Sequence, residues 1–225
     1  MGTMSTASLG EPTPTSYAML GLLALRPWTT YELAKQMQRS VRWFWPRAER
    51  KLYEEPKRLA ALGLATSETT TTGRRRSTVY RITPAGRRAL TDWLRAGPGA
   101  PMQVEMEAMI RVFFADGASP EDLRATLAAV GAQANDTLAE LGMLAAGTLS
   151  EEDDFPERRA TNAVALELWV RLHETVRDWS TWAQEEVQSW PPERRGRRQV
   201  AAGSPERGAE MFDGIVRRIG KRTSA

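Results

Sequence analysis

The sequence contains no cysteine, and that absence excludes several kinds of chemistry at once. Without cysteine the chain can form no disulfide, offer no thiolate to a metal and supply no thiol nucleophile, which fits a reducing compartment. Histidine is almost as scarce, because His173 is the only one in 225 residues. A lone histidine forms neither a catalytic relay nor a metal site, so we assign it a structural role.

Patterns typical of enzymes are missing as well. The chain has no P-loop, no nucleophile elbow and no HExxH pair. Its acidic run at residues 151–154 resembles a solvated loop more than a cation site. We therefore expect no enzyme activity, no catalytic residue, no metal site and no cofactor.

Long apolar runs do not occur either. The longest, from Tyr17 to Leu25, is far shorter than the roughly 20 residues needed to cross a bilayer. Residues 1–16 show no basic start followed by an apolar stretch, so no secretory signal is predicted. We expect a cytoplasmic protein with no membrane partner.

Charge is abundant but unevenly distributed along the chain. Residues 1–96 carry 16 Lys and Arg against 7 Asp and Glu, a net charge of +9. Residues 97–190 carry 6 against 17, a net of −11, and residues 191–225 carry 9 against 4, a net of +5. A basic module joined to an acidic one indicates that the first faces a polyanion.

The first 96 residues predict three helices. After a small, polar segment at 1–14 that we expect to be disordered, "SYAMLGLLAL" predicts an apolar helix. "TTYELAKQMQ" predicts a second helix, opened by a capping box of Thr29 and Glu32. A third is predicted over 47–62, with a kink at Pro56 or a fresh start near Glu55, because proline breaks a helix interior.

A β-hairpin and a fourth helix follow. "LATSETTTTGRRRSTVYRIT" contains two β-prone runs about a Thr72-Gly73 turn, which predicts a hairpin with three arginines at its tip. Thr83 then caps a helix with Pro84 in its first turn. Three helices, a hairpin and a helix are the order of a winged helix-turn-helix.

Beyond the "GPGAP" hinge at 97–101, long apolar stripes predict helices that exceed what one thin domain can bury. A first helix over 102–116 is expected to bury Met102, Met106, Met109, Ile110 and Phe113. Ser119 with Asp122 gives a capping signal for a second helix, on which one long stripe is formed by Leu123, Leu127, Val130, Ala134, Leu138, Leu141 and Ala145. A further long stripe runs over 164–187, and a second chain is the expected cover of both. We expect the dimer to be held by Leu127, Leu138, Val164, Leu168, Leu172, Val176 and Trp179.

The arginines at the hairpin tip call for a negative partner. Arg74, Arg75 and Arg76 could reach the phosphates or the narrow minor groove of DNA. The predicted helix 47–62 could lie in the major groove, where arginine and lysine address guanine. The spacing of Ala48, Leu52, Leu59 and Leu62 predicts its buried face. Its predicted exposed face carries Arg47, Arg50, Lys51, Glu54, Lys57 and Arg58.

At this point the residues carry a resemblance. "YAMLGLLALRPWTTYELAKQM", "FWPRAERKLYEEPKRLAALGLA" and "GRRRSTVYRITPAGRRALTDWL" are similar to the PadR family of bacterial transcriptional regulators. The resemblance implies a winged-helix repressor that dimerises through long C-terminal helices. It also implies that Tyr53 lies near the DNA backbone. Thr30 and Tyr31, at the start of the second helix, complete the candidate DNA-binding set.

The resemblance further implies a small aromatic effector. Met106, Trp169 and Trp182 are the candidate residues for such a site, as family members that sense flat aromatic compounds imply. The alternative, that the tryptophans serve core or dimer packing, remains open.

The expected fold class is mainly α with a small β-hairpin wing. A winged helix-turn-helix DNA-binding domain would span 15–96 and a helical dimerisation and effector domain 101–190. A basic tail would follow over 191–225, with a short amphipathic helix that uses Met211, Phe212, Ile215 and Ile219. The expected function is that of a homodimeric repressor that binds a pseudo-palindromic operator and is released by a small-molecule effector. The rival hypothesis is a winged-helix module whose basic face docks an acidic protein partner.

Overall fold

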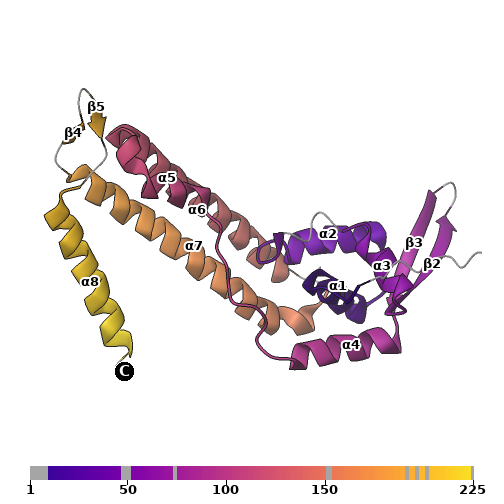
Figure 1. Cartoon of the computed structure of the whole chain (residues 1–225). Coiled ribbons are helices and arrows are strands. Elements are labelled where there is room, and N and C mark those ends of the chain that lie inside the picture. The colour runs from indigo at the N-terminus through magenta and orange to yellow at the C-terminus, as the bar shows by residue number, and fades with distance from the viewer. Residues whose placement is uncertain are drawn as a thin grey trace, which may run out of the picture. The chain divides into compact units, whose positions relative to one another are not determined.

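The computed structural model describes residues 10–46, 52–72, 75–150, 154–190, 193–195, 198–200 and 203–223. The chain divides into two compact units, residues 1–102 and 103–225. Figure 1 follows the chain through both units, and each unit is described by itself. The division falls one residue beyond the proline and glycine-rich hinge expected from the sequence.

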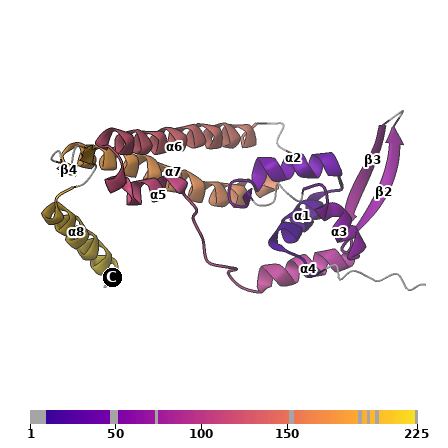
Figure 2. The same cartoon turned by 45° about the horizontal axis from the view of Figure 1, so that its top comes forward.

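The first unit is a set of helices around a small sheet. Its core is formed by the helices α1, α2 and α3 and by the short strand β1 between α1 and α2. The most buried side chains of these helices, each at most 1% exposed, include Met19, Leu20, Leu33, Met37 and Leu59. In Figures 1 and 2, α2 and α4 lie on different sides of α1. The helices are α1 (Pro14–Leu25), α2 (Thr30–Ser40), α3 (Glu55–Ala61) and α4 (Pro84–Arg95).

The first helix begins earlier than the sequence led us to expect. Residues 1–14 were expected to be disordered, yet α1 opens at Pro14 and is capped by Thr13, whose hydroxyl accepts from the backbone N–H of Ser16. Proline at the first helical position costs no hydrogen bond, since that N–H has no partner inside the helix. The expectation is wrong for residues 10–14, while residues 1–9 lie outside the described part of the chain.

The third helix is shorter than the predicted span of 47–62. Residues 52–54 form a turn, and α3 starts at Glu55 with Pro56 in its first turn. A proline there keeps all interior hydrogen bonds, so of the two predicted outcomes the fresh start is confirmed. Leu52 and Leu59 are buried as their spacing predicted.

The sheet of the first unit has the strand order β1-β3-β2. The long hairpin of β2 (Ala65–Thr72) and β3 (Arg75–Ile82) is antiparallel throughout, from the pair Ala65–Ile82 to the pair Thr72–Arg75. β1 (Trp28–Thr29) pairs with Tyr80 and Val79 alone. The predicted hairpin is confirmed, and its base is a three-stranded sheet.

Helix α4 closes against the base of this hairpin. Thr83 caps it as predicted, accepting from the N–H of Gly86 at 3.0 Å, and its own hydroxyl donates to the carbonyl of Gly63. A Cβ at Gly86 would lie 2.1 Å from the carbonyl oxygen of Leu64. Only glycine permits this approach, which fixes the hairpin to α4.

The second unit is dominated by two long antiparallel helices. α6 and α7 lie side by side in both views (Figures 1 and 2). Ser119 and Asp122 form the predicted capping box of α6, and their hydrogen bonds hold the pKa of the Asp122 carboxyl below its usual range. The elements are α5 (Glu107–Phe113), α6 (Pro120–Thr148), α7 (Arg159–Gln188) and two 3-10 turns, Ala115–Gly117 and Pro156–Arg158.

Helices α6 and α7 approach each other closely at a pair of small residues, Gly131 and Ser180. The Ser180 hydroxyl donates to the carbonyl of Leu127 at 2.7 Å, and a Cβ at Gly131 would lie 2.6 Å from that hydroxyl. Leu127, Val130 and Leu141 of α6 are buried as their periodicity predicted. The helix pair therefore has a packed seam of its own.

The predicted burial of the segment at 102–116 is wrong for a single chain. Helix α5 covers only part of that segment and contains no buried residue. Met102 is 71% exposed, Ile110 62% and Phe113 80%, while Met106 is half-buried. One thin helix pair offers too little apolar surface to cover α5, which leaves these side chains at the surface of the monomer.

The tail contains more structure than the short helix that was expected. Beyond α7 the chain forms a small antiparallel hairpin and then helix α8, which carries Met211, Phe212 and Ile215 along one face, as the spacing predicted. These tail elements are β4 (Glu193–Arg195), β5 (Arg198–Val200) and α8 (Pro205–Thr223). Across the described residues, no helix is both long and apolar enough to span a membrane.

Candidate nucleic-acid interface

The outer half of the hairpin stands apart from the rest of its sheet. The third strand, β1, reaches only Tyr80 and Val79. Four further cross-strand pairs, from Thr69–Thr78 to Thr72–Arg75, continue beyond it as a two-stranded ribbon. Figure 1 shows the ends of β2 and β3 extending away from the helices of the first unit. The geometry is that of a wing.

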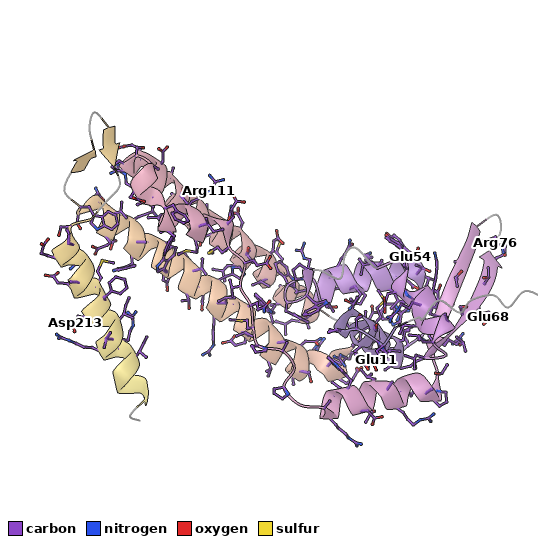
Figure 3. All side chains as sticks on the ribbon, in the orientation of Figure 1. Glu11, Glu54, Glu68, Arg76, Arg111 and Asp213 are labelled. Carbon is purple, nitrogen blue, oxygen red and sulfur yellow. The ribbon has the colours of Figure 1, made fainter. Side chains whose placement is uncertain are left out.

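Arginines occupy the tip of this wing opposite neutral residues. Arg76 faces Thr71 across the ladder, and Arg75 faces Thr72. Figure 3 shows Arg76 on the outer part of the hairpin, while Glu68 lies nearer the base, where it pairs with Val79. Since the cross-strand neighbours are threonines, the strand β2 supplies no counter-charge directly opposite the arginines.

The start of α2 places two candidate residues at the surface. Thr30 is the first residue of the helix and is half-buried, whereas Tyr31 is 62% exposed. The capping box of Thr29 and Glu32 is confirmed, with the Thr29 N–H donating to the Glu32 carboxylate at 2.8 Å. That bond holds the pKa of the Glu32 carboxyl below its usual range. The Thr29 N–H is thus already paired, and the Tyr31 side chain lies exposed beside it.

Tyr53 lies two residues before α3 and is 57% exposed, with Leu52 buried beside it. The first exposed turn of α3 carries Lys57, whose ammonium donates to the Glu54 carboxylate at 2.9 Å. This hydrogen bond raises the pKa of the Lys57 side chain. The structure therefore brings an exposed tyrosine and an exposed lysine to the beginning of α3.

Several candidate residues fall where the structure gives no placement. Arg47, Arg50, Lys51 and Arg74 lie outside the described residues, as does Ala48 of the predicted buried face. For Arg75 only the backbone is described, in β3. Their assignment to DNA binding stays a prediction from the sequence.

Arg58 does not belong to the exposed face on which the sequence analysis placed it. Its guanidinium donates to the Glu55 carboxylate at 2.9 Å and to the Ser16 hydroxyl at 3.1 Å. The Ser16 hydroxyl donates in turn to Glu55, which is 2% exposed. These three side chains form a polar cluster that joins the first turn of α3 to the first turn of α1.

Arg58 also fixes the chain that precedes α1. Its second terminal nitrogen donates to the carbonyl oxygens of Gly10 at 2.9 Å and Glu11 at 2.6 Å. Sequence reasoning missed this cluster, since a glutamate and an arginine three residues apart on a helix usually form an exposed pair. The available signal was Pro56, which places Glu55 in a first turn where a carboxylate is favoured.

The candidate dimerisation residues separate into two groups. Leu127 is 1% exposed within its own chain, so its assignment to the interface is corrected: it faces α7, in a cluster with Leu123, Ala183 and Val187. The others keep surface that a partner could cover. Val164 is 77% and Leu168 59% exposed, and the half-buried members are Leu138, Leu172, Val176 and Trp179.

The two candidate effector tryptophans lie far apart on helix α7. Trp169 and Trp182 both lie on α7, and 13 residues of helix separate them by about 20 Å. Trp169 is half-buried beside His173, with ring centroids 6.2 Å apart, and partial burial lowers the pKa of that histidine. Trp182 is 47% exposed, and Met106 precedes α5. A single planar ligand could not touch both tryptophans of one chain.

No metal centre can be built from the residues that are described. Within that part of the chain, His, Asp and Glu side chains nowhere gather in a group of three or more that could hold an ion.

Helices α1 to α3, an antiparallel hairpin with arginines on its outer half, and a closing helix define the winged helix-turn-helix class. Comparison with known families agrees. Residues 19–92 match the transcriptional regulator PadR-like family. Residues 106–188 match the family described as the virulence activator alpha C-terminal region. Neither description is that of an enzyme.

Individual relatives support the same assignment. The negative transcriptional regulator PadR of Bacillus subtilis is 30% identical over 99 residues, which are 44% of this chain and about half, 54%, of that protein. The structure of B. subtilis PadR with operator DNA has a TM-score of 0.66 at 21% identity, over 76% of this chain and 97% of the other. Its structure with p-coumaric acid has a TM-score of 0.61 at 19% identity, over 77% and 98%.

The polar cluster on α3 yields a direct test of how that helix is held. We expect Arg58→Met to lower the free energy of unfolding by about 3–5 kcal/mol, because the buried Glu55 carboxylate loses its counter-charge. Lys57→Met is the matched control. Its pair with Glu54 is exposed, so the loss should stay below about 1 kcal/mol.

Urea unfolding followed by circular dichroism measures both variants. Equal losses for Arg58→Met and Lys57→Met would contradict the assignment of Arg58 to a buried cluster. Restoring neutrality with the double variant Glu55→Gln and Arg58→Met should recover part of the stability, since the uncompensated charge is then gone.

Proposed function

We propose that this protein is a sequence-specific DNA-binding transcriptional regulator, a homodimeric repressor released from its operator by a small-molecule effector. The observation that carries the proposal is the wing. Its outer ribbon pairs Arg75 and Arg76 with threonines, so the opposite strand offers them no negative charge. The match to the PadR-like family over residues 19–92 and the operator complex of the B. subtilis protein support DNA as their negative partner.

Charge density supports a nucleic-acid partner independently of the fold. The net charge of +9 over residues 1–96 is opposed by −11 over residues 97–190. Basic residues that neutralise phosphates release condensed counterions, which gives affinity for any duplex. Only the first unit has the charge to gain from this effect, so we assign DNA binding to residues 15–96.

Sequence selection requires a second element that can reach base edges. An α-helix fits the major groove, and the chain from residue 47 through α3 is the candidate. Tyr53 and Tyr31 stand exposed at the starts of α3 and α2, where hydroxyls can meet phosphates. The polar cluster of Ser16, Glu55 and Arg58 holds α3 on α1, which fixes α3 within the unit.

Dimerisation is proposed from the apolar surface of the second unit. Val164, Leu168, Ile110 and Phe113 are each 59% to 80% exposed in the monomer. Monomeric proteins rarely leave large apolar patches uncovered. A second copy of the same chain would supply the surface that covers these side chains. The two-fold symmetry of that dimer predicts a pseudo-palindromic operator. We assign this role to residues 101–190.

Effector release is proposed by extension from a relative. The B. subtilis protein has been crystallised with p-coumaric acid, a small planar aromatic compound. In this chain the half-buried ring of Trp169 beside His173 is the side-chain pair that best suits such a ligand. Trp182 and Met106 would then either contact the ligand from the partner copy or lie outside the ligand site. Repression follows from the description of the relative as a negative regulator.

The wing should set affinity rather than sequence preference. Changing Arg74, Arg75 and Arg76 together to alanine should weaken binding to operator and unrelated duplexes by a similar factor. The slope of log affinity against log salt should fall by roughly one unit for each lost phosphate contact. The matched control is Arg88→Ala with Arg95→Ala, which removes exposed arginines from α4. Fluorescence anisotropy over a salt series measures both.

An unchanged salt slope in a folded triple variant would contradict the placement of the wing on DNA. The same titrations test the rival function. If the wild-type protein bound duplex DNA no better than the triple variant, while its basic face retained an acidic protein, the protein-interaction module would be the better account.

The dimer should depend on the exposed stripe of α7. Leu168→Asp with Leu172→Asp would bury unpaired charge at the interface, which costs about 3 kcal/mol or more and raises the dimer dissociation constant at least roughly 100-fold. Ala163→Asp with Thr181→Asp adds the same charge to the other side of the helix and should change it little. Sedimentation equilibrium reports both constants. A folded wild-type monomer at micromolar concentration would exclude the dimer.

Effector binding and DNA binding should oppose each other. Titration with p-coumaric acid should change tryptophan emission, and operator affinity should fall by the factor by which DNA weakens effector binding. Trp169→Phe should remove most of the emission change, whereas Trp182→Phe should keep it. A panel of planar aromatic acids that alters neither emission nor operator affinity would exclude aromatic release.

A further inference from the structure

Helix α8 lies outside both family matches, neither of which extends beyond residue 188. The 19-residue helix therefore gets no role from the family descriptions. Its role has to be found in its own residues.

The beginning of α8 is firmly attached to α7. The Arg207 guanidinium donates to both oxygens of the Glu186 carboxylate, at 2.8 and 2.6 Å. Glu186 is 8% exposed and also accepts from the indole N–H of Trp190 at 3.2 Å. A Cβ at Gly203 would lie 2.9 Å from the Trp190 ring, so the ring packs against this glycine. A bidentate pair on a buried carboxylate orients the helix as it leaves the unit.

Beyond this attachment α8 exposes an apolar face. Met211, Phe212, Ile215 and Val216 recur at the spacing of one helical side, and Phe212 is 72% and Val216 68% exposed. Arg217 pairs with Asp213 at 2.5 Å, and Figure 3 marks Asp213 on this helix. An amphipathic helix of this length is marginal in water without a surface for its apolar side, so its stability calls for a cover.

The charge of α8 indicates what covers it. Four basic residues and no acidic residue occur between positions 216 and 223. Helices α6 and α7 together contain nine Asp and Glu against four Lys and Arg, a net of −5. The same unit also exposes large apolar side chains, among them Val164, Leu168 and Phe113. Its surface therefore offers both the apolar contact and the negative charge that α8 lacks.

We propose that α8 is an arm that packs on the acidic helical unit, residues 103–190, of a second copy of this chain. The attachment of Arg207 to Glu186 directs the arm away from its own α7, and its apolar face closes over exposed apolar residues of the partner. The arm extends the dimer interface into a segment outside both family matches. This inference rests on the proposed homodimer and not on DNA binding.

The absence of cysteine makes the arm easy to map in the full-length protein. Val216→Cys introduces the only thiol, which takes a benzophenone maleimide on the apolar face. Light and nitrogen-15-labelled copies are mixed before irradiation, and cross-linked peptides are analysed by mass spectrometry. We expect peptides that join α8 of one isotope to residues 103–190 of the other. Gly214→Cys, on the polar side, should give at least fivefold fewer.

Two substitutions test the energetic contribution. Ile215→Asp places a charge in the apolar face and should raise the dimer dissociation constant at least tenfold. Gly214→Asp adds the same charge one residue away, where a Cβ meets nothing within 4 Å, and should change the constant less than twofold. Sedimentation equilibrium of the full chain without DNA keeps this result separate from the proposed function. If the wild-type protein cross-linked between copies but did not bind DNA, the proposed arm would be supported while the proposed function would be contradicted.

Three outcomes would overturn the proposal. The first is cross-linking confined to peptides of a single isotope, which would show α8 packed on its own chain. The second is an equal response of the dimer to Ile215→Asp and Gly214→Asp. The third is sedimentation of the wild type with vesicles of anionic phosphatidylglycerol that Ile215→Asp abolishes, which would assign the apolar face to a membrane surface.

Discussion

The Glu55 carboxylate is almost completely withdrawn from solvent, and the first unit is arranged around satisfying it. Burying a charge is costly unless it is paired and hydrogen-bonded. Here the Ser16 hydroxyl and the Arg58 guanidinium supply those bonds, and Arg58 extends them to the carbonyls of Gly10 and Glu11. One carboxylate thus joins α3, α1 and the segment before α1. The helix that would read DNA is placed by this contact.

A second constraint acts on the other unit, where apolar surface exceeds what one chain can cover. The seam of α6 and α7 closes through Leu127, Gly131 and Ser180, and it leaves Leu168 and α5 exposed. The two units therefore present complementary needs. One lacks negative charge opposite its wing, and the other lacks apolar cover. A symmetric dimer on duplex DNA satisfies both at once, which is why we favour a regulator over a docking module.

Local signals in the sequence were sufficient for much of the fold. The capping pairs Thr29–Glu32 and Ser119–Asp122 predicted the starts of α2 and α6, and the threonine-rich runs around Gly73 predicted the strands of the wing. These features are set by neighbours in sequence. Burial of Glu55, exposure of α5 and the attachment of Arg207 to Glu186 depend on residues far apart in the chain, so periodicity alone assigned Arg58 and Phe113 to the wrong environments. Thr13 and Pro14 did carry a capping signal, which the polar composition of the first 14 residues obscured.

The central claim is that a two-fold symmetric dimer reads duplex DNA through its winged-helix units. The most direct measurement is selection from a random duplex library with the full-length protein at physiological salt, followed by sequencing of the retained fraction. The account predicts a pseudo-palindromic motif whose half-sites are separated by about 10 base pairs or a multiple of that spacing. Enrichment of a single unrepeated site would contradict the symmetric dimer, and the absence of any enriched sequence would contradict the reading of DNA itself.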